Sequence, residues 1–207
     1  MTGTAVGMTA FFVVYFHLLR HPRQPPIVMP LIAVDHWIAF WPPSLVLYLS
    51  LWVYVSLGAA FLVRARELVS YAVAAAALAI AGLTMFYLWP TSIPPAGIDW
   101  SVHPHFIFLK SVDAAGNACP SLHVAFAVFA GAWLDRSLRA MGAGPVPRIA
   151  NLCWCLGIAY STVATRQHVA LDVFAGAALG LLAVAANFRI TPPPAAMDAP
   201  HQDVTMR

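Results

Sequence analysis

Charged residues are scarce in this chain: Asp, Glu, Lys and Arg together make up 9% of its 207 residues, and Lys110 is the only lysine. The formal net charge is +3 and the basic residues are scattered, so we expect no nucleic-acid partner. Three cysteines, Cys119, Cys153 and Cys155, are too few for a disulfide framework. Hydrophobic residues instead make up 61% of the chain, with a mean hydropathy of +0.76, which is typical of an integral membrane protein.

Six apolar runs predict the membrane-spanning segments, each approaching the roughly 20 residues that a helix needs to cross a bilayer. They fall at residues 3–19, 44–63, 68–89, 121–134, 149–164 and 169–188. The fourth and fifth runs are short, so their helices have to continue through polar residues at their ends. No small-residue cleavage pattern follows the first run, so we expect it to remain as a helix. The sequence predicts an all-α fold: one integral membrane domain, residues 1–190, forming a bundle of six transmembrane helices, followed by a tail at 191–207 of disordered-type composition.

The distribution of basic residues predicts which ends of the helices face the cytoplasm, because Lys and Arg are favoured in cytoplasmic loops. If the chain begins inside, seven basic residues lie on the cytoplasmic side: Arg64, Arg66, Arg136, Arg139, Arg148, Arg189 and Arg207. Four lie outside: Arg20, Arg23, Lys110 and Arg166. With this topology the loop at 90–119, the start of the fourth span and the turn before the sixth span meet at the outer face. We therefore expect the functional site to face the periplasm or the exterior. The membrane is expected to be a bacterial inner (plasma) membrane, which the basic-residue count itself does not specify.

A segment between the first two spans, residues 24–43 (QPPIVMPLIAVDHWIAFWPP), mixes apolar and aromatic residues with prolines and the pair Asp35 and His36. Trp37 and Trp41 are suited to the headgroup region of a bilayer, where Trp side chains are enriched. We interpret this segment as lying in the membrane interface rather than crossing it.

The last apolar run begins with three ionisable residues within the stretch TRQHVALD at 165–172. His168 and Asp172 are four residues apart, so on a helix they share a face, and the carboxylate can orient the imidazole and stabilise its positive charge. The same spacing continues to Gly176 and Gly180, small residues that favour close helix contact. Ionisable groups inside a span are costly and by default mark functional sites. We therefore predict that His168 and Asp172 face the interior of the bundle.

The fourth span opens with CPSLH, residues 119–123. Proline is favoured as the first residue of a helix, so a helix that begins at this proline leaves the N–H groups of Ser121, Leu122 and His123 without partners. Such groups at a helix start bind anions, and the Ser121 hydroxyl can add a further donor, so a phosphate fits this position. With His123 beside the anion and His168 across from it, two imidazoles are available for different roles, one as a nucleophile and one as a proton donor.

The motif PSLH at 120–123, followed by His168-x3-Asp172, resembles the second and third motifs of the type 2 phosphatidic acid phosphatase (PAP2) superfamily, usually written Pro-Ser-Gly-His and Ser-Arg-x5-His-x3-Asp. The Leu122 variant is most similar to the branch that contains inositol phosphotransferases of sphingolipid synthesis. The resemblance implies a six-helix bundle of PAP2 type. It also implies phosphoryl or phosphoalcohol transfer on lipids without a metal or a cofactor.

The resemblance also implies roles for individual residues. His168 would attack phosphorus to form a phosphohistidine, Asp172 would orient it, and His123 would protonate the leaving alkoxide. Ser121 would bind the phosphate.

Two departures from the superfamily pattern concern its positively charged residues. The first motif, Lys-x6-Arg-Pro, is absent, because Asn117 stands where the arginine would follow Lys110. In the third motif Ser161 is present, but Thr162 replaces the arginine. A phosphoryl group in transfer needs cationic compensation, so Arg166 and Lys110 are the candidate substitutes.

Each candidate residue also has a purely structural interpretation. His123 and His168 could be core histidines whose ring nitrogens bond to nearby polar groups. Ser121 could only cap its helix. Arg166 and Lys110 could anchor the ends of their segments by reaching to the headgroups.

The outer loop holds further polar residues. Asp113 and Asn117 suit a role in shaping the loop and capping the fourth helix. His103 and His105 are spaced like metal ligands, but no Cys or His at zinc-site spacing accompanies them, so we expect no metal site.

Three functions are compatible with these residues. The first is hydrolysis of a lipid phosphate or pyrophosphate. The second uses the same intermediate with an alcohol acceptor, as when an inositol-type headgroup is transferred to ceramide or diacylglycerol. The third is a non-enzymatic proton or cation carrier built on the intramembrane His and Asp. For the enzymes the expected partners are a lipid phosphate substrate and membrane lipids. No pattern in the sequence specifies an oligomeric state.

Overall fold

The computed structural model describes residues 2–112 and 116–191, and nearly all the regular structure in these residues is helical. Asp113 and the tail residues 192–207 lie outside the described residues. A helix occupies each of the six predicted spans. The helices are α1 (Thr2–Arg20), the run of η1 (Pro42–Ser44), α3 (Leu45–Leu49) and α4 (Leu51–Ala60), α5 (Ala65–Leu88), α7 (Leu122–Ala140), α8 (Pro145–Ala164) and α9 (Ala170–Ile190).

Three of the described helical segments are long and apolar enough to cross a membrane: Pro42–Ala60, Ala65–Leu88 and Ala170–Ile190. Helices α7 and α8 continue through polar residues beyond the apolar runs, as the short fourth and fifth runs required. Within α1, the segment Ala5–Arg20 is apolar but shorter. The fold is therefore a helical one of membrane type, and crossing by all six helices stays a prediction.

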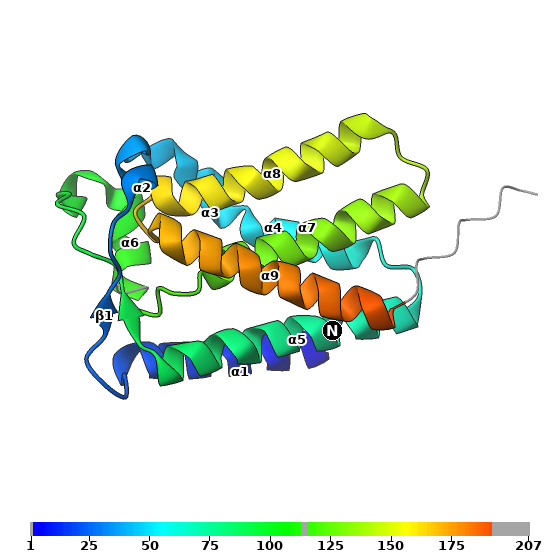
Figure 1. Cartoon of the computed structure of the whole chain (residues 1–207), viewed down its shortest axis with the longest axis horizontal. Helices are drawn as coiled ribbons and strands as arrows, with labels where there is room; N and C mark the ends of the chain where they lie inside the picture. The colour runs from blue at the N-terminus through cyan, green and yellow to red at the C-terminus, as the bar shows by residue number, and fades with distance from the viewer. Residues whose placement is uncertain (1, 113–115, 192–207) are drawn as a thin grey trace, which may run out of the picture.

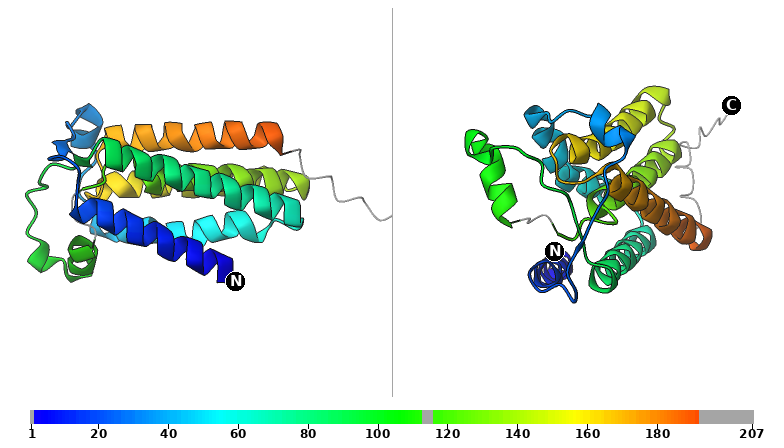
Figure 2. Two further views of the ribbon diagram at one scale, coloured as in Figure 1. Left: turned by 90° about the horizontal axis from the view of Figure 1, so that it is seen from below. Right: turned by 60° about the vertical axis from the view of Figure 1, so that its left-hand side comes forward.

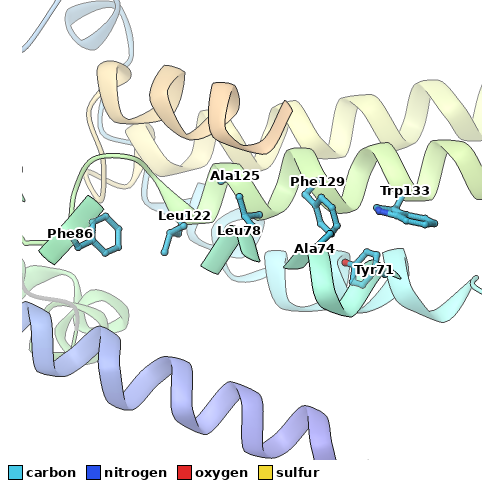
Figure 3. Packing of buried hydrophobic residues seen from close by; sticks show 8 residues of the cluster. All are labelled: Tyr71, Ala74, Leu78, Phe86, Leu122, Ala125, Phe129 and Trp133. Atoms are coloured by element: carbon cyan, nitrogen blue, oxygen red, sulfur yellow. The ribbon is translucent and has the colours of Figure 1, made fainter. Parts of the chain in front are cut away.

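The long helices run side by side, and α7 contacts α4, α5, α8 and α9 (Figures 1 and 2). This central position follows from its sequence, because the small residues Ala125, Ala127 and Ala130 are fully buried and let neighbouring helices approach. A cluster of buried hydrophobic side chains, small and large, fills the space between α5 and α7 along their length (Figure 3). They are Tyr71, Ala74, Leu78 and Phe86 from α5, and Leu122, Ala125, Phe129 and Trp133 from α7.

Short elements gather at one end of the bundle (Figure 1). They are β1 (Ile27–Val28), α2 (Ala33–Trp37), β2 (Thr91–Ser92), η2 (Trp100–Val102) and α6 (Pro104–Val112). β1 and β2 pair in parallel over two residues each, a feature that the all-α prediction did not include. The first residues of α7 and α9 lie at this same end (Figure 1). The predicted convergence of these segments is confirmed, while the side of the membrane on which they lie stays a prediction.

Thr91 fixes the loop that leads into α7. Its side chain is buried, its carbonyl accepts the N–H of Ala118 at 3.3 Å, and its hydroxyl accepts the N–H of Cys119 at 2.8 Å. Asn117 adopts a φ of 50° and donates its side-chain amide to the Tyr15 carbonyl at 3.0 Å. The predicted role of Asn117 in shaping this loop is therefore confirmed, and the loop is tied to α1 as well as to β2. Its predicted role in capping the fourth helix is wrong, because Ser121 is the N-cap of α7 and the Asn117 side chain bonds to Tyr15 instead.

Candidate functional site

The turn between α8 and α9 carries His168. Arg166 takes a φ of 55° in this turn, a left-handed conformation that reverses the chain. The Thr162 carbonyl accepts the N–H of His168 at 3.0 Å, and the Ser161 carbonyl accepts the Thr165 hydroxyl at 2.6 Å. The Ser161 and Thr162 side chains are fully buried. Both third-motif positions therefore serve to hold the turn in shape.

His168 and Asp172 face each other, as their spacing predicts. The distance from His168 Nδ1 to Asp172 Oδ2 is 3.5 Å, and Oδ2 also accepts the N–H of Val169 at 3.0 Å at the start of α9. The Asp172 side chain is fully buried, whereas the His168 side chain keeps 11% of its surface exposed. Among the described residues, His168 Nδ1 and Asp172 Oδ1 have no hydrogen-bond partner. A small movement of the ring would close this pair, and a positive charge on the imidazole would favour that closure.

A backbone hydrogen bond joins the two motifs directly. The Ser121 N–H donates to the Asp172 carbonyl at 3.0 Å. This approach is possible because position 176 is glycine: a Cβ there would collide with the Ser121 carbonyl. One turn further along α9, a Cβ at Gly180 would lie 2.7 Å from the Ala125 carbonyl. The predicted contact through Gly176 and Gly180 is therefore confirmed, and it brings the start of α7 against the first turn of α9.

Helix α7 begins at Leu122, so the predicted helix start at Pro120 is wrong. The reason is that Ser121 acts as the N-cap: its hydroxyl oxygen accepts the N–H of Val124 at 3.3 Å, which keeps Ser121 itself outside the helix. The prediction that the Ser121 N–H has no partner is also wrong, because this group donates to the Asp172 carbonyl, but the other two N–H groups of the predicted open start remain. Within the described part of the chain, the N–H groups of Leu122 and His123 meet no acceptor. These two groups are the donors that this helix start offers to an anion.

His123 is held by one residue that the sequence did not mark. Its Nε2 lies 2.7 Å from the Tyr48 carbonyl, and its ring stacks on the Tyr48 ring with centroids 3.9 Å apart and planes 10° apart. Tyr48 is buried, while His123 stays partly exposed. Tyr48 belongs to α3 and lies 75 positions before His123. No motif or spacing in the sequence connects the two.

The two candidate cations meet at the turn between α8 and α9: Arg166 is part of the turn, and Lys110 contacts its backbone. The Arg166 guanidinium donates to the Ile38 carbonyl at 3.0 Å and to the Asp35 carbonyl at 3.5 Å, at the end of α2. Lys110 Nζ donates to the Arg166 carbonyl at 3.0 Å and lies 4.7 Å from the centroid of the Trp100 ring. The structure therefore brings both cations to the end of the bundle where the short elements lie, and each donates to backbone carbonyl groups there.

Asp35 is a second residue that the sequence interpretation missed. Its side chain is 3% exposed; one carboxylate oxygen accepts the N–H of Ala170 at 2.7 Å and the other accepts the N–H of Ile32 at 2.9 Å. The sequence predicts that residues 24–43 lie in the membrane interface. The exposed Trp37, at 78%, agrees with this prediction, but the buried Asp35 carboxylate does not. The available signal was the charge itself, a carboxylate within an apolar stretch.

Of the two loop histidines considered as metal ligands, His103 packs on aromatic rings, whereas His105 is exposed. The His103 ring lies 5.1 Å from the Phe40 ring, which also contacts Trp100 and Phe106. Over residues 2–112 and 116–191, the structure shows no group of three or more His, Cys, Asp or Glu side chains that could hold a metal ion.

The comparison with protein families agrees with this arrangement. Residues 64–194 match the PAP2 superfamily, a region that contains both motifs and helices α5, α7, α8 and α9. We found no significant match among curated proteins or among solved structures. The family match does not distinguish the branch suggested by Leu122. Because it covers more than half of the chain and includes the joined Ser121 and Asp172 segments, the chain belongs to the PAP2 superfamily.

Proposed function

We propose that this protein transfers a phosphoryl group from a lipid phosphate or pyrophosphate through a phosphohistidine at His168. Membership of the superfamily supports phosphatase or phosphotransferase activity in general. The observation that carries the finer proposal is the hydrogen bond from the Ser121 N–H to the Asp172 carbonyl. It fixes the open helix start, which suits an oxyanion, against the helix turn that carries Asp172 and faces His168.

In the first step, Nε2 of His168 attacks phosphorus while Nδ1 faces Asp172. The new N–P bond forms as the P–O bond to the leaving group breaks, and His123 gives its proton to the departing oxygen. Asp172 stabilises the positive charge that develops on the His168 ring. Lipid alcohol leaves from a monoester, and lipid monophosphate leaves from a pyrophosphate.

In the second step, an acceptor hydroxyl gives its proton to His123 and attacks phosphorus, and the N–P bond breaks. His168 returns to its free form and His123 regains its proton. With water as acceptor the product is inorganic phosphate. With an alcohol the product is a phosphorylated acceptor. When the donor is a phospholipid diester, the P–O bond to its lipid alcohol breaks instead, His168 carries the phosphoalcohol headgroup, and the acceptor alcohol takes the headgroup as the N–P bond breaks.

Phosphate binding in this proposal combines backbone and cationic groups. The N–H groups of Leu122 and His123 point out of the start of α7, where the helix dipole favours an anion. The Ser121 hydroxyl is adjacent. Arg166 and Lys110 supply the positive charge that the transferring group needs, and Arg166 does so by moving from the α2 carbonyls to the phosphate.

The substrate class follows from where the site lies. The candidate residues sit at the end of a bundle whose outer surfaces carry many exposed apolar side chains, so a lipid can bring its phosphate to the site from within the bilayer. The basic-residue distribution supports an extracytoplasmic location for this end. The proposed membrane is the plasma membrane of a bacterium.

The test is phosphate release by the purified protein in detergent with EDTA, using a panel of lipid phosphates and pyrophosphates. We expect release by the wild type and none by His168→Ala. His105→Ala, which changes an exposed histidine at the same end of the bundle, is the matched control and should keep wild-type rates. Near wild-type rates in His168→Ala would overturn the assignment of the nucleophile.

The same assay separates the other two functions. If the wild type releases no phosphate, inositol-type lipids and ceramide are supplied, and a transferred headgroup that disappears in His168→Ala identifies an alcohol acceptor. A proton or cation carrier would show neither reaction, and reconstituted vesicles would then show ion movement that depends on His168 and Asp172.

A further inference from the structure

Tyr48 contacts the His123 ring in two ways, by ring stacking and by a hydrogen bond to its backbone carbonyl. The stacked rings are 3.9 Å apart and tilted by only 10°, so the plane of the imidazole is set by the tyrosine ring. The hydrogen bond from Nε2 to the Tyr48 carbonyl, at 2.7 Å, sets the rotation of the imidazole within that plane. Tyr48 itself is buried with 6% of its surface exposed, so it provides a fixed platform.

The hydrogen bond also determines which ring nitrogen can exchange a proton. A backbone carbonyl only accepts hydrogen bonds, so Nε2 of His123 must carry hydrogen while this bond exists. In the neutral ring Nδ1 is then the unprotonated nitrogen, and in the charged ring the proton available for transfer sits on Nδ1. A histidine without such a partner would divide its neutral form between both tautomers.

We propose that Tyr48 is a positioning residue for proton transfer, which holds His123 so that Nδ1 is the nitrogen that gives the proton to the leaving oxygen and takes it from the acceptor. This inference rests on the proposed function, in which His123 is the general acid and base. Tyr48 acts through His123, with no contact to the reacting phosphate required.

Leaving-group dependence tests this role. An aryl phosphate with an acidic phenol needs little protonation of its leaving oxygen, whereas an alkyl phosphate depends on it. His123→Ala should therefore slow kcat for a lipid alkyl phosphate by about 100-fold or more and for an aryl phosphate by much less. Tyr48→Leu, which removes the stacked ring, should show the same selective loss at about tenfold. Tyr48→Phe keeps both the ring and the carbonyl, and both its rates should stay within about threefold of wild type.

The double variant separates positioning from a general structural effect. Once His123 is alanine, Tyr48→Leu should cause no further loss with the alkyl phosphate, because the group that it positions is gone. An equal loss with both substrates in Tyr48→Leu, or an added loss in the double variant, would overturn the role of Tyr48. If His123→Ala itself slowed both substrates equally, the general-acid role of His123 would fail, and the inference would fail with it.

A measurement that needs no Tyr48 variant keeps the inference testable if Tyr48→Leu does not fold. In ¹⁵N-histidine NMR spectra of the wild type in detergent, the resonances lost in His123→Ala identify this ring. At a pH where that ring is neutral, we expect a protonated Nε2 and an unprotonated Nδ1. The opposite tautomer, or an equal mixture of both, would overturn the assignment of the exchanging nitrogen.

Discussion

The Asp35 carboxylate accepts a hydrogen bond from the Ala170 N–H at 2.7 Å, joining residues 135 positions apart in the chain. Arg166 precedes His168 in the turn, and its guanidinium donates hydrogen bonds to the Asp35 and Ile38 carbonyls, which makes a second contact with the same segment. The turn that carries His168 is therefore tied to α2 at both of its ends. The position of the proposed nucleophile depends on a segment near the other end of the chain.

Replacing Asp35 should loosen this turn. Asp35→Ala leaves the N–H groups of Ala170 and Ile32 without their acceptor, at a cost of about 1–3 kcal/mol in the free energy of unfolding. Asp35→Asn keeps one acceptor oxygen and should lie between alanine and wild type. Thermal unfolding in detergent and phosphate release measure the two consequences. Asp99→Ala is the control, because that carboxylate is exposed and bonds only to Ser101 among the described residues. If Asp99→Ala lost as much stability and phosphate release as Asp35→Ala, the hydrogen bonds of Asp35 would not be what holds the turn.

Arg166→Ala separates phosphate binding from anchoring. If the guanidinium binds the substrate phosphate, its loss should raise KM by about tenfold or more, because charge-assisted hydrogen bonds to phosphate are strong. The thermal midpoint should also fall, since the Ile38 carbonyl loses its donor. Arg23→Ala, at the same end of the bundle but against the Tyr87 ring, should leave KM unchanged. A lowered midpoint with an unaltered KM in Arg166→Ala would leave Arg166 with the anchoring role alone.

Gly176→Ala should disrupt the contact between the two motifs. The added methyl group meets the Ser121 backbone carbonyl, which cannot move without shifting the start of α7. We expect a loss of about 1–3 kcal/mol in stability and a strong reduction in phosphate release. Gly7→Ala is the control, because a Cβ at Gly7 in α1 meets nothing within 4 Å. Normal activity in Gly176→Ala would show that the approach of Ser121 to Asp172 is not needed for function.

Cys119 should react slowly with thiol reagents at neutral pH. Burial, with a smaller contribution from the Asp172 carboxylate, raises the pKa of the Cys119 thiol to about 11. Only the thiolate reacts, so at pH 8 about one thiol in a thousand is available, and the rate should rise about tenfold per pH unit until pH 11. Alkylation by iodoacetamide in a Cys153→Ala, Cys155→Ala background measures this profile. A plateau at or below pH 9 would contradict it.

The positions of the long helices could be predicted from hydrophobicity because each is an apolar run of nearly membrane-spanning length. The short elements that gather at one end of the bundle could not be predicted in this way. β1 and β2 contain two residues each, and they pair only because α1 and α5 deliver them to the same place. The start of α7 was also placed too early, since the capping hydrogen bond of Ser121 outweighs the general preference for proline at the first helical position.

Within the site, the sequence predicted the contacts that depend on local spacing. His168 lies in the turn just before α9 and Asp172 lies in the first turn of that helix, so their separation of four residues still brings them together. Gly176 continues the helix face of Asp172. The contacts of Asp35 and Tyr48 span 135 and 75 positions, so they depend on how α2 and α3 pack against the rest of the bundle. A single sequence carries no periodic signal for such pairs.

Asp35 and Tyr48 also lie before residue 64, where the region matching the superfamily begins. A fragment cut to the matching boundaries would retain every residue of the two motifs. It would lack the acceptor that binds the Ala170 N–H and the ring and carbonyl that hold His123. We therefore expect the smallest active unit of this protein to be larger than the part by which its family is recognised, so that truncations or chimeras should include the N-terminal segments.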